Sequence, residues 1–180
     1  MIPRRWPLLL VVLTGCIEGL NSLTWYLAEG SVGDLAAPSG CSSQKNATID
    51  FDGARSSYTA LHAGRARIGC SGLSRIVLDV RKATRLEIEG PDSAESTSYA
   101  TFRVLAFDAS GTELTLGKRS PITWSYPAEF TRSTSCGDIL PICPGETIAK
   151  LRGPAGTHTI AVSFGGVTAR REVTWLPRAQ

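Results

Sequence analysis

The chain has 180 residues, of which 42% are hydrophobic and 19% are charged, and its formal net charge is +3. This length allows one large domain or two small ones. Arg4 and Arg5 supply two of the three net charges and lie in the N-terminal segment, so the rest of the chain is nearly neutral. Without a clustered basic face, nucleic acid is not expected as a partner.

The N-terminal segment has the three-part order of a secretory signal peptide, predicted over residues 1–15. Positive charge at residues 4–5 is followed by an apolar stretch over residues 6–13 and then by two small residues directly before Cys16. The apolar run is well short of the ~20 residues that a transmembrane helix needs.

The tetrapeptide Leu13-Thr14-Gly15-Cys16 resembles the lipobox of bacterial lipoproteins. In that family the signal is cut before the cysteine, which is then acylated on its thiol and its new amine. The resemblance implies lipid attachment at Cys16, with the membrane as a partner, and each buried acyl CH₂ would add ~0.8 kcal/mol of anchoring. The next residue is Ile17 rather than Asp, which in Gram-negative lipoproteins favours the outer membrane. The alternatives are an ordinary signal peptide with a chance cysteine, or an uncleaved anchor.

The five cysteines are an odd number. With Cys16 assigned to lipid, four remain for disulfides in an oxidising compartment: Cys41, Cys70, Cys136 and Cys143. Of the three possible connectivities we favour Cys41–Cys70 and Cys136–Cys143, because each pair then stays within one apparent domain. Zinc is the weaker alternative, since neither histidine lies at finger spacing from a cysteine. We expect no metal and no cofactor.

Residues 16–40 are predicted to be a lipidated tether, because glycine and proline mark residues 30–40 as loop. Within this tether, residues 23–27 predict either a first strand or a short helical turn near the membrane. Residues 131–146, rich in Ser, Gly and Pro, are predicted to be a loop stapled by the second disulfide.

From residue 46 onward apolar and polar residues alternate with a period of two, and no amphipathic helix is found. Many short strands separated by Gly and Pro turns predict an all-β fold, an antiparallel β-sandwich. The predicted strands cover residues 47–51, 58–61, 66–70, 76–80, 86–89, 99–107, 114–116, 121–125, 148–151, 158–164 and 171–175.

Two stretches, residues 58–72 and 148–166, are similar to each other. Each has a short strand, an Ala-Gly turn and an alternating strand closed by glycine, and each is followed by a further strand. A repeat of this kind predicts two related modules.

The second copy resembles the bacterial Ig-like domains of intimin-type surface proteins. Three segments carry the resemblance: Ala106-Phe107-Asp108-Ala109-Ser110-Gly111, Ile122-Thr123-Trp124-Ser125 and Ala155-Gly156-Thr157-His158-Thr159-Ile160. The resemblance implies an Ig-like sandwich over residues 83–177, with Trp124 buried between its sheets and no enzyme activity.

The first copy, residues 41–82, is expected to be a short or partial Ig-like module. Trp25 is the candidate counterpart of Trp124, although the strand that should precede it is missing. The tripeptide Arg81-Lys82-Ala83 resembles the junction between tandem modules. A junction that passes directly from strand to strand would leave the modules little freedom.

No catalytic constellation is found, and the Gly-x-Ser-x-Gly elbow of many serine hydrolases is absent. Asp50, Asp52 and Asp108 could hold calcium between modules, but solvated loop acids are the favoured interpretation. Three arginines, at positions 65, 67 and 75, are expected on a solvated strand face.

These features favour a lipid-anchored protein of the bacterial cell envelope, at the outer membrane, with a non-catalytic structural, adhesion or interaction role. The alternative is a lipoprotein subunit of an outer-membrane assembly or secretion complex that docks a dedicated protein partner. A carbohydrate-binding protein or a hydrolase is the least favoured reading.

Overall fold

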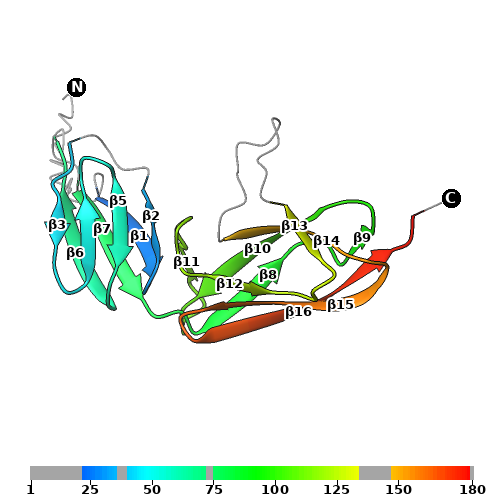
Figure 1. The fold of residues 1–180 in the computed structure, drawn as a ribbon. Coiled ribbons are helices and arrows are strands. Elements are labelled where there is room, and N and C mark those ends of the chain that lie inside the picture. Colours follow the sequence, from blue (N-terminus) through cyan, green and yellow to red (C-terminus); the bar gives the residue numbers. More distant parts are fainter. Residues whose placement is uncertain (1–21, 36–39, 72–74, 134–146, 179–180) are drawn as a thin grey trace, which may run out of the picture.

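The computed structural model describes residues 22–35, 40–71, 75–133 and 147–178. Over these ranges the chain forms sixteen strands, β1 to β16, and the predicted all-β fold is confirmed (Figure 1). The same ranges hold no helix that could cross a membrane.

Strands β1 to β7 form a first module of two facing sheets. One sheet has the order β1-β7-β6, with β1 parallel to β7, and the other has the order β2-β5-β4-β3 and is antiparallel throughout. The strands are β1 (Ser22–Ala28), β2 (Val32–Asp34), β3 (Gln44–Lys45), β4 (Ile49–Asp52), β5 (Ser57–Ala60), β6 (Gly64–Gly69) and β7 (Arg75–Arg81).

Strands β8 to β16 form a second, larger module, again of two facing sheets. One sheet has the order β11-β10-β14-β13, with β8 also paired to β10, and the other has the order β12-β15-β16-β9. The strands are β8 (Arg85–Glu89), β9 (Ser93–Glu95), β10 (Ala100–Phe107), β11 (Glu113–Leu114), β12 (Thr123–Ser125), β13 (Thr131–Ser133), β14 (Ile148–Arg152), β15 (Gly156–Phe164) and β16 (Val167–Leu176).

Each module has its own hydrophobic core, built from the inward-facing residues of both sheets. The alternation that predicted the strands is the alternation of burial: β8 runs exposed, buried, exposed, buried, exposed along its five residues. The first core centres on Phe51 and Leu78, and the second on Phe102 and Trp175, all of them almost fully buried. Fully burying one such aliphatic or aromatic side chain stabilises the fold by ~1.5–3 kcal/mol.

The predicted repeat is confirmed as a structural one. In each module a strand of one sheet leads into a hairpin of the other, β5 into β6–β7 and β14 into β15–β16. The glycines of the two Ala-Gly turns, Gly64 and Gly156, both have positive φ, 153° and 134°, a region that glycine enters without steric cost. Among the described residues no strand pairs with the outer edge of β6, whereas β12 pairs with β15, so the first module is the shorter of the two.

Two predictions about the first module are wrong. The tether does not extend to residue 40, because β1 pairs with β7 along its whole length and buries Leu27 and Ala28. Trp25 is not the counterpart of Trp124, because it lies on β1 opposite Leu78, whereas Trp124 lies on β12.

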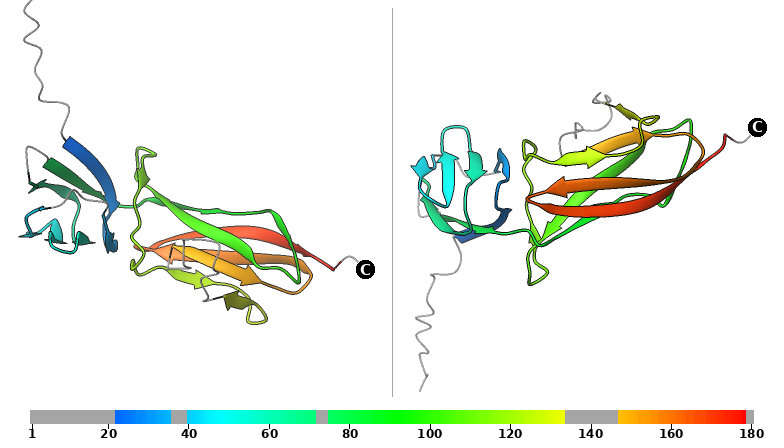
Figure 2. Two further views of the ribbon diagram at one scale, coloured as in Figure 1. Left: turned by 90° about the horizontal axis from the view of Figure 1, so that it is seen from above. Right: turned by 60° about the horizontal axis from the view of Figure 1, so that its bottom comes forward.

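The two modules lie side by side with their strands in different directions. In Figure 1 the strands of the first module run upright and those of the second run across the view, like two arms of an L. The second view of Figure 2 shows the same arrangement, with β16 ending on the side of the second module that faces away from the first.

Candidate functional site

The junction between the modules is the most highly organised polar region of the described chain. Strand β7 ends at Arg81 and β8 begins at Arg85, so only residues 82–84 connect the two sandwiches. The middle linker residue, Ala83, is itself buried in the second core, and so is Ala28 at the end of β1. The linker is therefore short, and both the linker and the neighbouring end of β1 pack against the second core.

Backbone hydrogen bonds join β1 of the first module to the segment that follows β11 in the second module. The Thr115 amide donates to the Tyr26 carbonyl at 2.7 Å, and the Ala28 amide donates to the Thr115 carbonyl at 3.2 Å. Thr115 thus forms a parallel bridge with Leu27 in the middle of these bonds. Strand β1 is tied to β7 on one edge and to the segment after β11 on the other.

A second contact brings the backbones of the two modules together at two glycines. A Cβ atom on Gly33 would lie 2.6 Å from the Gly117 Cα, closer than side chains pack. On either side of this contact the Arg119 amide donates to the Val32 carbonyl at 3.0 Å, and the Val32 amide donates to the Ser120 hydroxyl at 3.1 Å. These residues are more than 80 positions apart in the chain, so glycine at both sites is what lets the backbones approach.

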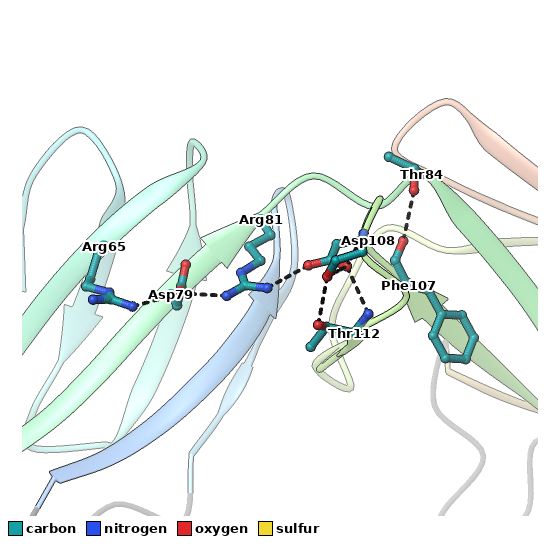
Figure 3. A network of polar contacts seen from close by, with 8 residues as sticks. Arg65, Asp79, Arg81, Thr84, Phe107, Asp108 and Thr112 are labelled. Atoms are coloured by element: carbon teal, nitrogen blue, oxygen red, sulfur yellow. Dashed lines mark hydrogen bonds and ion pairs between the residues drawn. The ribbon is translucent and has the colours of Figure 1, made fainter. Parts of the chain in front are cut away.

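The third contact is a chain of charges across the linker (Figure 3). The Arg81 guanidinium donates to the Asp79 carboxylate at 3.0 Å and to the Asp108 carboxylate of the second module at 2.7 Å. It also lies 4.4 Å from the centre of the Tyr26 ring, within cation–π range. Arg65 extends the network, donating to Asp79 at 3.3 Å.

The Asp108 side chain organises the turn that receives Arg81. Its carboxylate accepts hydrogen bonds from the Ser110 hydroxyl and from the amides of Ser110 and Thr112, at 2.6, 2.8 and 2.9 Å. The Ser110 hydroxyl, followed by Arg81, holds the pKa of Asp108 well below its usual range, and the bond from Arg81 likewise lowers the pKa of Asp79. Both carboxylates are therefore ionised at neutral pH, and Arg81 pairs with both of them, with Arg65 as a second cation beside Asp79.

The three acids considered for calcium do not come together. Asp108 lies at the junction, whereas Asp50 pairs with Lys45 at 2.9 Å and Asp52 with Arg55 at 3.8 Å on β4 and its following loop. Among the described residues no group of three or more His, Cys, Asp or Glu side chains could hold a metal ion. At the junction the positive charge between two carboxylates is a guanidinium.

A cleft of about 340 Å³ lies beside the linker, with Glu29, Lys82 and Phe164 among its lining residues. The His62 imidazole lies 3.5 Å from the carboxylate of Glu29, one of the lining residues. The described residues that line this cleft include no Ser, Thr or Cys side chain that could act as a nucleophile beside a base.

The predicted disulfide residues have different outcomes. Cys41 and Cys70 form a disulfide as predicted, linking the segment before β3 to the end of β6. Cys16, Cys136 and Cys143 lie outside the described residues, so lipid attachment and the second disulfide stay predictions.

Trp124 is 9% exposed and packs in the second core, as predicted, and Trp175 is 1% exposed in the same core. The tripeptide Arg81-Lys82-Ala83 marked the junction in the sequence. Nothing marked Gly33, Gly117 or Arg119, because these residues meet only once both modules have folded.

No family model matches the chain, and no curated protein matches it. Among solved structures, domains 4–9 of the surface layer protein SbsC are 16% identical over 88% of this chain and 31% of that chain, with a TM-score of 0.39. Domains 5–6 of SbsC are 14% identical over 87% of this chain and 94% of that one, with a TM-score of 0.40. Extracellular cadherin domains 3–6 of protocadherin gamma B2 are 10% identical over 90% and 46%, with a TM-score of 0.35. This chain spans less than a third of the first of these structures, and likenesses this distant assign no function.

Proposed function

We propose that the protein is a lipid-anchored, non-catalytic component of the bacterial cell envelope that holds its second Ig-like module at a fixed orientation to the membrane. The observation that carries this proposal is the junction. A linker of three residues is combined with separate contacts at Thr115, at Gly117 to Ser120 and at Asp108.

Modules joined within one chain move relative to each other by default, unless the interface between them is extensive. Here the contacts to the first module come from β1, from β2 and from the end of β7. Because these contacts are made by three different strands, rotation about the linker would break at least one of them. A fixed angle between modules is useful to a spacer or an adhesin, which must present a surface at a set distance and direction.

The proposal includes a protein partner in the envelope that binds the end of the second module away from the junction. Tyr99, directly before β10, and Leu176, at the end of β16, are 43% and 48% exposed. Both are at strand ends opposite those that meet the linker. Aromatic side chains that are exposed at a protein surface are typical of interface cores.

Acylation of Cys16 is tested by mass spectrometry of the mature N-terminal peptide and by labelling cells with palmitate. We expect a mature chain that begins at Cys16 and carries acyl mass, with no label in the Cys16→Ser variant. An ordinary cleavable signal peptide placed before the Cys16→Ser chain should release it into the soluble envelope fraction. An unmodified Cys16 in the membrane-bound protein would refute the lipoprotein assignment.

Two further measurements test the membrane in which the protein resides and the partner that it binds. Ile17→Asp should move the acylated protein from the outer to the inner membrane, while Ile17→Ser, the matched control, should not. Crosslinking in intact cells should recover a defined protein partner that is lost in the Tyr99→Ser/Leu176→Ser variant. Recovery of one stoichiometric complex of assembly or secretion proteins would identify the protein as a subunit of that machine.

A further inference from the structure

The outer face of the sheet β1-β7-β6 is divided into two halves. At the end where β1 and β7 finish, which we call the junction end, Tyr26, Asp79 and Arg81 are engaged with each other or with Asp108 of the second module. At the end where β1 and β7 begin, which we call the anchor end, no described residue of the second module is hydrogen-bonded to this face. The described part of the second module therefore leaves the anchor end uncovered.

Two arginines occupy the anchor end. Arg75 begins β7 and Arg67 lies on β6, and the strand register makes them diagonal neighbours, because Arg67 is opposite Val77 and Arg75 is opposite Gly69. Both side chains are exposed. Diagonal residues of neighbouring strands lie about 7–8 Å apart, close enough for two guanidinium groups to act on one anionic surface.

Neither arginine is neutralised within the described chain. Among the described residues neither Arg67 nor Arg75 has an acidic partner within ion-pair distance, and Asp79, the one acid on the described part of this face, is shared by Arg65 and Arg81. Leu23, 55% exposed at the start of β1, is the register partner of the buried Ile76, so it lies on the opposite face of the sheet from these arginines. Two exposed guanidinium groups without an acidic neighbour suit an anionic surface.

The first module begins at β1, so this surface lies close in the chain to Cys16, whose acylation is part of the proposed function. Only residues 17–21 separate Cys16 from β1. A chain of this length spans at most about 20 Å even when fully extended. Arg75 is the register partner of Ser22, one strand spacing or about 5 Å further away. The anchor end is thus held within a short distance of the lipid headgroups.

We propose that the anchor end of this sheet, through Arg67 and Arg75, lies against the anionic phospholipid headgroups of the membrane that holds the acyl chains. Guanidinium groups bind phosphate bidentately and are weakly hydrated, so they pair readily with phospholipid phosphates. A second, electrostatic contact beside the lipid anchor orients the first module. The fixed junction then carries that orientation to the second module.

The test is co-sedimentation of the released mature Cys16→Ser chain with lipid vesicles at low ionic strength. We expect binding to vesicles of phosphatidylglycerol mixed with phosphatidylcholine, and none to phosphatidylcholine alone. Binding should weaken at 0.1 M salt, where the screening length is about 10 Å. Arg67→Gln and Arg75→Gln should each lower the affinity about 5-fold, the effect of one basic residue near an anionic surface.

Arg170→Gln is the matched control, since Arg170 is equally exposed but lies on β16 of the second module. Equal binding to both vesicle types, no binding to either, or an equal loss in the Arg170→Gln variant would each overturn the proposal. The Cys16→Ser chain carries no acyl groups, so its binding to vesicles is independent of the measurement that tests acylation of Cys16. If Cys16 is acylated but the Cys16→Ser chain shows no preference for phosphatidylglycerol vesicles, the protein is a lipoprotein without this docking face.

Discussion

Gly117→Ala tests the fixed junction without touching either hydrophobic core. The added Cβ would lie 2.1 Å from the Val32 carbonyl oxygen and 2.5 Å from the Gly33 Cα, where real Cβ atoms stay at least 3.0 Å away. Both obstructing atoms are backbone, so the two modules must separate locally by about 1 Å. A shift of this size breaks the bonds from Arg119 to Val32 and from Val32 to Ser120, now 3.0 and 3.1 Å long.

The expected loss follows from those two bonds. Each contributes about 0.5–1.5 kcal/mol net, so the local stability of the junction should fall by about 1–3 kcal/mol. The assay is amide hydrogen exchange of Val32 and Arg119, where this loss corresponds to about 5- to 150-fold faster exchange. The stability of each core should change little.

The matched control is Gly69→Ala, because a Cβ on Gly69 meets no atom within 4 Å. Exchange at Val32 and Arg119 should be the same in this variant as in the unaltered chain. Unchanged exchange in Gly117→Ala would refute the inference that close backbone contact fixes the junction. Small-angle scattering adds an independent measure, since a loosened junction widens the distribution of distances between the modules.

Three further predictions concern stability. Replacing both residues of the Cys41–Cys70 disulfide by alanine should lower the unfolding free energy of the first module by about 3–4 kcal/mol, because the bond closes a loop with a separation of 29 residues. Denaturant titration measures this free energy. An unchanged value would show that the first core stabilises the module without the disulfide. Trp124→Ala should cost about 3–5 kcal/mol in the second module, and a nearly neutral effect would mean that Trp124 is not a core residue. Asp108 has a lowered pKa in the folded state, so its contribution is present above the ordinary value of 3.8 and is lost as the pH falls below it. The Asp108→Asn variant should therefore be less stable than the unaltered chain at pH 7, and its unfolding temperature should fall less between pH 5 and pH 3. Parallel pH profiles of the unfolding temperature for the two chains would contradict the role given to this carboxylate.

Much of each module could be predicted from local patterns. Alternating residues such as Ile76, Leu78 and Val80 require one buried and one exposed face, and this period of two is specific to strands. The repeat of a strand, an Ala-Gly turn and a hairpin in the sequence corresponds to β5–β7 in the first module and β14–β16 in the second. The Cys41–Cys70 disulfide followed from keeping each cysteine pair within one module.

The first strand could not be predicted in the same way. Residues 23–27 are an apolar run without clear alternation, and such a run suits a strand or a helix equally well. Its state is decided by β7, about fifty residues further along the chain, which pairs with it from Ser22 to Ala28. This pairing also shortened the expected tether and placed Arg75 beside Ser22, close in the chain to the proposed lipid attachment at Cys16.

By itself, the sequence determined the strand-rich fold, the two related modules, the inward tryptophan of the second and the position of the linker, because these depend on residues near one another in the chain. Only the tertiary structure decided how the modules are held together. The approach of Gly33 to Gly117 and the bond from Arg81 to Asp108 join residues from separate sandwiches. Such contacts leave no periodicity in the sequence, since they form between surfaces that exist only after each core has folded.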